Sequence, residues 1–259
     1  MRRVLLATCV VGLLTVFGAG IARAEPVLMA LDGQSSNNIE SAEALGHTVG
    51  TAWLSDIANM TPEDLAPYDA VFVSPGFGNS GYSALRSAVR NGGSLQRYVA
   101  GGGTIVLNVA GNFGNQGNIA PGGVGFFFGI HNQETFAGPL HRYLTGEMSQ
   151  NDDYEGAELV PSDFDDWLNT DHGHLTNLRG QTVTILRNVN GASLVEYGEG
   201  DGRVIVSTLT VGWAEFGESR GAPQSNLIDY ALKTPVPEPT TLALFAVAAM
   251  AVFRRRTAR

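Results

Sequence analysis

Residues 101–109 read GGGTIVLNV: three glycines, then a run of β-branched and apolar residues. This stretch decides the fold class. The glycines end a preceding helical segment, and the run predicts a strand buried on both faces. Residues 26–31, PVLMAL, repeat the pattern and end in Asp32-Gly33. Strands buried on both faces occur almost only in parallel sheets covered by helices, so the sequence predicts an α/β protein.

Strand-like and helix-like segments alternate outward from this stretch. Thr61 followed by Pro62 is a typical helix start, and Gly92-Gly93 breaks a long helical segment. Alternation of this kind predicts a doubly wound parallel sheet. The predicted strands are 26–31, 47–53, 69–73 and 104–109, and the predicted helices are 36–45, a short one from 61, 82–100 and 223–232.

The second half of the chain gives a different pattern. Three strands are predicted at 182–187, 193–197 and 203–208, and the Glu199-Gly200-Asp201-Gly202 turn makes the last two an antiparallel hairpin. Residues 110–180 are polar and glycine-rich, and we interpret them as a long loop or insertion with a short helix near 164–168. The expected fold is therefore α/β: a mostly parallel doubly wound sheet with an antiparallel hairpin near the end, in one domain at 25–233.

The amino terminus has the composition of a secretory signal peptide. Arg2 and Arg3 precede an apolar stretch, and Ala22 and Ala24 form a small-x-small cleavage site for signal peptidase. Residues 1–24 would be removed; the alternative is a cytosolic protein with an N-terminal core strand. The chain's one cysteine, Cys9, lies in this segment, so the mature protein would have no thiol and no disulfide.

The carboxyl terminus, residues 234–259, has three parts in order: a Pro237-Glu238-Pro239 spacer, an apolar run at 241–253, and a basic end at 254–259 that begins Arg254-Arg255-Arg256. As a helix, the run would be about 18 Å long, which is short for a bilayer core of about 30 Å. The arginines would stay on the cytoplasmic side. The alternative interpretation is an ordinary C-terminal membrane anchor.

This arrangement resembles the PEP-CTERM sorting signal of Gram-negative bacteria, the substrate of exosortases. The resemblance implies export, transient anchoring in the inner membrane through the C-terminal helix, and removal of the tail. The destination would be the cell envelope, the surface or an exopolysaccharide matrix. The implied partners are signal peptidase, exosortase, the membrane before processing and exopolysaccharide.

The charge of the mature chain argues against nucleic acid as a partner. The whole chain has a formal net charge of −9, with 16 basic and 25 acidic residues. The two terminal segments hold seven of the basic residues and one acidic residue, Glu238, which leaves 9 against 24, or about −15. Such a body repels phosphate backbones. A Gly111-x-x-Gly114-x-x-Gly117 pattern follows a strand, but no lysine follows it, so it does not predict nucleotide binding.

Ser74-Pro75-Gly76 after a strand, GGGTIVL at 101–107 and GRVIVST at 202–208 together resemble the class I glutamine amidotransferase-like (flavodoxin-like) fold. The resemblance covers residues 26–109 and 181–232. In that family a nucleophilic cysteine follows the strand equivalent to 104–109, where this chain has Ala110-Gly111. Because the mature chain has no cysteine, thioester chemistry is excluded. We expect a relative with no catalytic residues and no cofactor.

A ligand pocket is predicted beyond the carboxyl ends of the parallel strands, where open α/β sheets bind their ligands. Amide side chains and an aromatic ring there would suit sugars; the alternative is that these residues serve turns. The candidates are Asp32, Ser74, Asn79, Asn108, Asn112, Trp213 and Glu215.

We expect no metal, although one cluster has metal-ligand chemistry. His172 and His174 alternate beside Asp171, so both imidazoles would project to one side of an extended segment, and Asp152 and Asp153 lie upstream.

The sequence thus predicts an exported envelope or matrix protein with a non-catalytic domain that binds glycan or protein. Two alternatives stay open. One is a secreted hydrolase that uses Asp and His residues, with or without a metal ion. The other is a passive matrix component or simply a membrane-anchored protein.

Overall fold

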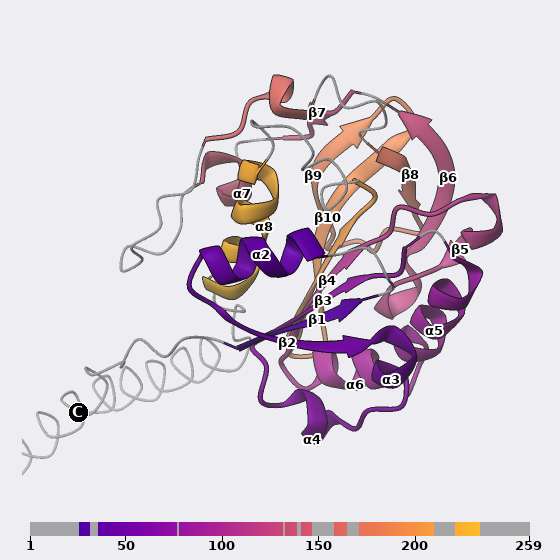
Figure 1. Ribbon diagram of the computed structural model, residues 1–259. Helices are drawn as coiled ribbons and strands as arrows, with labels where there is room; N and C mark the ends of the chain where they lie inside the picture. The colour runs from indigo at the N-terminus through magenta and orange to yellow at the C-terminus, as the bar shows by residue number, and fades with distance from the viewer. Residues whose placement is uncertain are drawn as a thin grey trace, which may run out of the picture.

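The computed structural model describes residues 26–31, 36–76, 78–131, 133–138, 141–146, 158–164, 171–209 and 221–233 (Figure 1). The predicted signal peptide and the sorting segment lie outside these residues. So do three of the predicted pocket residues, Asp32, Trp213 and Glu215, and the acidic pair Asp152 and Asp153. Among the residues described, no helix combines the length and the apolar character needed to cross a bilayer.

The first half of the sheet is parallel, as predicted. Its strands lie in the order β2 (Thr48–Trp53), β1 (Pro26–Leu31), β3 (Ala70–Ser74), β4 (Thr104–Asn108) and β11 (Gly202–Ser207), and each neighbouring pair is parallel. Every residue of β4 and β11 is buried. The continuous apolar runs therefore form the central strands, which confirms the α/β class.

The second half of the sheet is antiparallel and larger than one hairpin. The hairpin predicted around residues 199–202 is confirmed, because β10 (Gly191–Glu199) pairs with β11 in antiparallel register. Further antiparallel strands continue the sheet, which curls at that side (Figure 1). They are β5 (Gly117–Asn118), β6 (Gly125–His131), β7 (Thr135–Phe136), β8 (Asp171–Thr176) and β9 (Val183–Asn188).

The described residues between 110 and 180 therefore include paired strands, where the sequence predicted a long loop. Buried and half-exposed residues alternate along all six positions of β8, which is the pattern of a strand with one covered face. The covered face holds Asp171 and Gly173 next to Leu175, so this alternation is not visible as apolar against polar residues in the sequence. The described residues also hold α7 (Arg142–Thr145) and a 3-10 turn, η3 (Pro161–Phe164). Apart from residue 164, the predicted helix near 164–168 lies outside the described residues.

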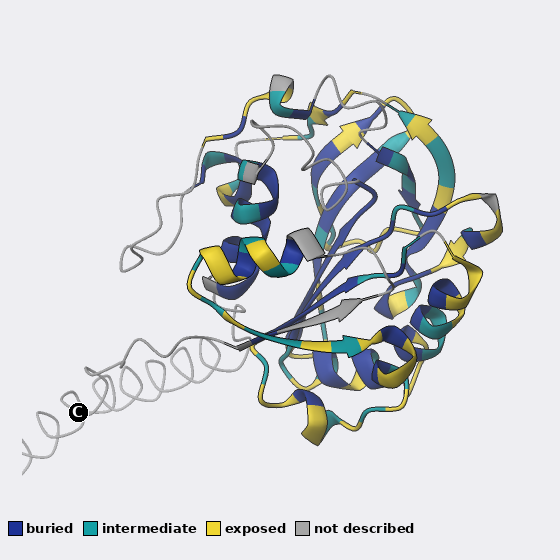
Figure 2. Ribbon diagram, in the orientation of Figure 1, coloured by how far each residue is buried: buried dark blue, intermediate teal, exposed yellow. Residues whose placement is uncertain are grey.

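Helices cover both faces of the parallel strands (Figure 1). On one face α2 (Ser36–Ala44) and α8 (Gly221–Lys233) pack over a core cluster that contains Phe72, Val106 and Ile228. The other face carries α3 (Leu54–Ile57), α4 (Pro62–Leu65), α5 (Asn79–Val89) and α6 (Ser94–Ala100) over a second cluster. Figure 2 shows the buried sheet between these two layers.

Local sequence signals explain where the helices begin and end. Thr61 and Asp64 form a reciprocal capping box at the start of α4, with Pro62 in the first turn. Gly92 has a φ of +76°, a left-handed conformation that separates α5 from α6. The predicted cap at Thr61 and the predicted break at residues 92–93 are both confirmed.

Candidate functional site

A row of polar side chains crosses the carboxyl ends of three parallel strands. Asn108 of β4 pairs with Ser207 of β11, and Ser74 of β3 lies one residue beyond the last paired position with β4. The residues two positions earlier belong to the core cluster under α2 and α8, so the row lies on that face. Asn38 of α2 reaches the row, with its Nδ2 3.5 Å from Ser74 Oγ. Two of the predicted pocket residues, Ser74 and Asn108, are thereby neighbours.

The start of α8 lies at the same edge of the sheet. Arg203, near the start of β11, donates hydrogen bonds to the carbonyl oxygens of Tyr230 and Ala231 near the end of α8. The helix therefore runs antiparallel to β11, and its first turns lie beside the carboxyl end of that strand. Gln224, in these first turns, is fully buried there.

Three buried amides at this edge have polar atoms without a hydrogen-bond partner. Asn38 and Gln224 are at most 2% exposed and Asn108 is 8% exposed. Among the residues described, Asn38 Oδ1, Asn108 Oδ1 and both amide atoms of Gln224 make no hydrogen bond. Each such group costs about 1–3 kcal/mol when it is left unsatisfied. Buried polar atoms of this kind call for an explanation, and a polar ligand at the edge is one.

The other two predicted residues, Asn79 and Asn112, lie on the opposite face. Both amides approach Gly114: a Cβ there would lie 3.0 Å from Asn79 Oδ1 and 3.3 Å from Asn112 Oδ1. Asn112 Oδ1 accepts a hydrogen bond from the Gly114 N–H at 2.9 Å and caps a short 3-10 turn. Asn112 therefore has the turn role that the sequence left open. The structure divides the predicted set into two pairs, one on each face.

His172 and His174 lie on strand β8 and not on a loop. Their positions alternate with buried Asp171 and Gly173, so both imidazoles are on the half-exposed face, as their spacing predicted. Asp171 points to the buried face and cannot complete a site with them. His172 Nδ1 lies 3.1 Å from the carbonyl oxygen of Gly111, and the His174 ring lies 5.3 Å from the ring of Phe127. Burial lowers the pKa of both histidines. In the part of the chain that the structure describes, no three His, Cys, Asp or Glu side chains form a metal-binding group.

Sequence reasoning missed a pair of buried acids behind these histidines. Glu134 is 2% exposed and Asp171 is fully buried. Asp171 accepts hydrogen bonds from Asn188 Nδ2 at 2.6 Å and from the Gly173 N–H at 3.1 Å. Ser193 Oγ donates to Glu134.

The surroundings of Glu134 favour its protonated form. Burial raises the pKa of Glu134 to about 10, and the hydrogen bond to Asp171 and the charge of Asp171 raise it further in the same direction. Glu134 is therefore neutral near pH 7, and it can donate to the Asp171 carboxylate. No sequence pattern indicates a role for Glu134, because the residues around it have no clear periodicity.

The buried acids fix the geometry next to the position that follows β4. Asp171 forms an isolated antiparallel bridge with Leu209, and Thr208 Oγ1 donates to the Gly173 carbonyl at 3.0 Å. His172, the next residue on β8, contacts Gly111 directly after β4. The arrangement has acids and a histidine but only Ala110-Gly111 where an amidotransferase-like domain would hold its nucleophile. It can bind and orient polar groups, and no side chain at this position can attack a carbonyl.

Fold and site together define an α/β domain with a polar carboxyl edge and no nucleophile after its fourth strand. Residues 235–256, beyond the described part of the chain, match the family model of the PEP-CTERM protein-sorting motif. This match confirms the predicted sorting signal, and it indicates export to the cell surface or envelope with processing by an exosortase. No curated protein matches the chain as a whole.

Several solved structures are similar in outline. A cytoplasmic protein from Salmonella typhimurium is 10% identical, with a TM-score of 0.48, and 81% of this chain covers 100% of that one. A putative ThuA-like protein from Bacteroides uniformis is 11% identical, with a TM-score of 0.43, over 81% of this chain and 93% of that one. An exo-beta-1,4-mannosidase from an Opitutaceae bacterium is 12% identical, with a TM-score of 0.46, over 81% of this chain and 36% of that one. These neighbours are not clearly amidotransferase-like, and the similarities are too distant to assign an activity.

Proposed function

We propose that this chain is an exported envelope or exopolysaccharide-matrix protein of a Gram-negative bacterium, cleaved at both ends. The observation that carries the proposal is the sorting motif at residues 235–256. Signal peptidase would cut after Ala24, with Ala22 and Ala24 as the small residues of its site. The apolar run at 241–253 would then hold the chain in the inner membrane, with Arg254, Arg255 and Arg256 on the cytoplasmic side.

Exosortase would act at the spacer before this run. Pro237 and Pro239 cannot continue a helix, and they favour an extended backbone that a processing enzyme can grip around Glu238. The short run favours temporary over permanent anchoring, because it falls well below the roughly 20 residues of a stable span.

Mass spectrometry of the protein recovered outside the cell tests this proposal. The expected mature form begins near Glu25 and ends before residue 241. A matched variant, with Pro237, Glu238 and Pro239 replaced by alanine, should stay in the membrane fraction with its tail intact. Recovery of an extracellular chain that still ends at Arg259 would overturn the proposal.

We infer further that the carboxyl edge binds a neutral, hydroxyl-rich ligand, such as a glycan, without catalysis. Three buried amides with unsatisfied atoms, Asn38, Asn108 and Gln224, support this function. A sugar hydroxyl both donates and accepts hydrogen bonds, so it can satisfy amide oxygen and nitrogen atoms alike. Because no cysteine follows residue 24, the domain cannot form a thioester intermediate.

Calorimetric titration of the full-length protein in detergent with neutral oligosaccharides tests the edge. Asn108→Leu and Gln224→Leu should abolish saturable binding. Each should also keep or raise the melting temperature, because an apolar side chain removes an unsatisfied polar group. Gln181→Leu, at an exposed turn position, is the matched control and should bind like the wild type. Absence of saturable binding in the wild type would favour a passive matrix component instead.

A further inference from the structure

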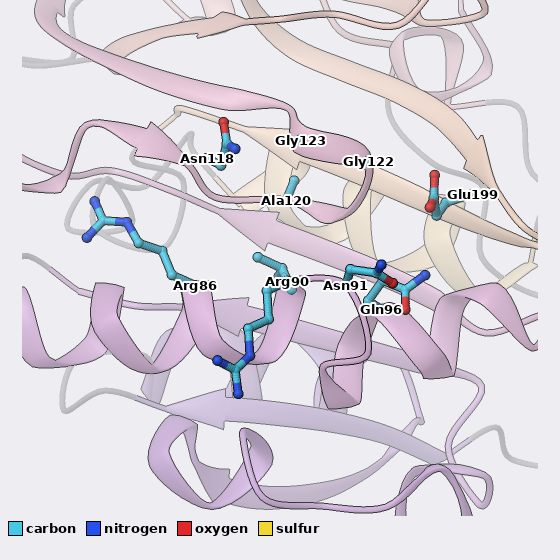
Figure 3. A pocket seen from close by; sticks show the side chains of 10 residues that line it. Arg86, Arg90, Asn91, Gln96, Asn118, Ala120, Gly122, Gly123 and Glu199 are labelled. Carbon is cyan, nitrogen blue, oxygen red and sulfur yellow. The ribbon is translucent and has the colours of Figure 1, made fainter.

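A pocket with charged and amide side chains lies away from the carboxyl edge. It has a volume of about 710 Å³, within the range of about 300–1,000 Å³ that is typical of small-molecule sites (Figure 3). The last turns of α5, the start of α6, the β5–β6 connection and the β10–β11 turn enclose it. Its lining residues are Arg86, Val89, Arg90, Asn91, Gln96, Asn118, Ala120, Gly122, Gly123 and Glu199.

Positive charge gathers at this pocket in an otherwise acidic domain. Residues 25–233 contain nine lysines and arginines against 24 acidic residues, yet two of the nine line the pocket and Arg179 borders it. Glu199 is the one acidic lining residue, and it forms an ion pair with Arg179. Because that pair is internally neutral, Arg86 and Arg90 give the pocket a local positive charge.

The two arginines present their charge in different ways. Arg86 Nη2 donates to the carbonyl oxygen of Gln116 at 2.8 Å, which fixes its guanidinium beside β5. Arg90, one helical turn later, is exposed, and among the described residues its side chain has no hydrogen-bond or ion-pair partner; only its backbone is bonded, to Arg86 and Gly93. In Figure 3, Arg86 extends toward the β5 side, whereas Arg90 is turned outward. Residues at i and i+4 share a helix face, and Arg90 lines the pocket together with Arg86.

Neutral amides complete the lining. Asn91, Gln96 and Asn118 each offer donors and acceptors for hydroxyl groups. Gln96 Oε1 accepts from the Gly92 N–H at 3.2 Å, which orients its NH₂ group. None of the described residues that line the pocket is aromatic, so they offer no platform on which a nucleobase could stack.

We propose that this pocket binds an oligosaccharide that carries carboxylates, that is, one built from uronic acids. Guanidinium groups match carboxylates in shape and charge, and the surrounding amides match the ring hydroxyls. The site is separate from the carboxyl edge and does not depend on ligand binding there.

Titration of the full-length protein with a short oligogalacturonate tests the proposal. The wild type should bind saturably, and binding should weaken as salt is raised from about 0.05 to 0.5 M. Arg90→Gln and Arg86→Gln should each raise the Kd about tenfold or more, as expected for the loss of a charge-assisted contact. Because the Arg90 side chain is exposed and has no hydrogen-bond partner among the described residues, its replacement should not impair folding. Arg187→Gln, an exposed arginine on β9 outside the pocket, is the control and should leave the Kd unchanged.

Three results would overturn the assignment. A neutral oligosaccharide of equal length that binds equally well would remove the role of the carboxylates. Inorganic phosphate or sulfate that competes at equal concentration would show a general anion site. Equal weakening by Arg187→Gln would show an unspecific charge effect. Asn108→Leu should leave oligogalacturonate binding unchanged, so failure of the edge site and failure of this pocket are distinguishable.

Discussion

Glu134 is a carboxyl group that the fold keeps protonated. Its neighbours are Asp171, which raises the pKa of Glu134, and Ser193, which donates a hydrogen bond to Glu134. The native protein thus binds a proton that the unfolded chain releases near the ordinary glutamate pKa of 4.5. The stabilisation from this proton is fully present below pH 4.5, and it is lost progressively as the pH rises toward about 10.

The wild-type melting temperature should therefore fall as the pH is raised from about 5 to 9. Glu134→Gln replaces the neutral acid with a neutral amide that cannot titrate, so the variant should lose much of this slope. Thermal unfolding followed by circular dichroism at several pH values measures both. Glu158→Gln, at an exposed position, is the control and should keep the wild-type slope. If the melting temperatures of the wild type and Glu134→Gln fell equally with pH, the raised pKa of Glu134 would be contradicted.

The candidate site shows how far single residues could be predicted. Ser74 and Asn108 were expected at the carboxyl edge because they follow buried apolar runs, and the structure places them side by side. Gln224 could not be predicted, because only the antiparallel course of α8 brings it to the same edge. Glu134 lies on a connection without periodicity, so no pattern indicates its burial.

At the scale of elements, Arg203 connects α8 to the sheet. It is 2% exposed, donates to the carbonyl oxygens of Tyr230 and Ala231, and lies 5.0 Å from the centre of the Tyr230 ring. A cation at the end of a helix satisfies unpaired carbonyls and interacts favourably with the helix dipole. One side chain therefore fixes the direction of the last helix, and with it the position of Gln224.

Arg203→Met should destabilise the domain by about 3 kcal/mol, because it removes these hydrogen bonds and leaves the Glu196 carboxylate without its cation. Urea unfolding of the full-length protein measures the change. Arg187→Met, at an exposed strand position, should change the stability by less than about 0.5 kcal/mol. A loss below 1 kcal/mol for Arg203→Met would show that the packing of α8 alone holds it in place.

The elements themselves were predicted unevenly. β3, β4 and β11 have unbroken apolar runs, so burial on both faces was evident from composition. β8 reads DHGHLT, and Asp171 and Gly173 on its covered face conceal a strand that only its partners β6 and β10 reveal. Antiparallel strands with one open face need not be apolar, and this explains why the region appeared irregular in sequence.

At the scale of the whole molecule, the proposed processing would change the net charge. The full-length chain carries −9, and removal of both terminal segments leaves about −15. The mature form should thus bind an anion-exchange column more strongly and focus at a lower pH than the full-length chain. Chromatography of the extracellular and membrane fractions compares the two forms. An extracellular form that elutes with the full-length protein would show that the basic ends remain.

The sequence by itself determined the α/β class, the parallel direction of the buried strands, the closing hairpin and the sorting tail. These features depend on local periodicity and on the linear order of the segments. Only the tertiary structure decided which polar residues meet. It separated Ser74 and Asn108 from Asn79 and Asn112, buried Glu134 against Asp171, and formed the pocket around Arg86 and Arg90. The physical reason is that strand pairing and helix direction bring together residues far apart in the chain, and no local pattern records these contacts.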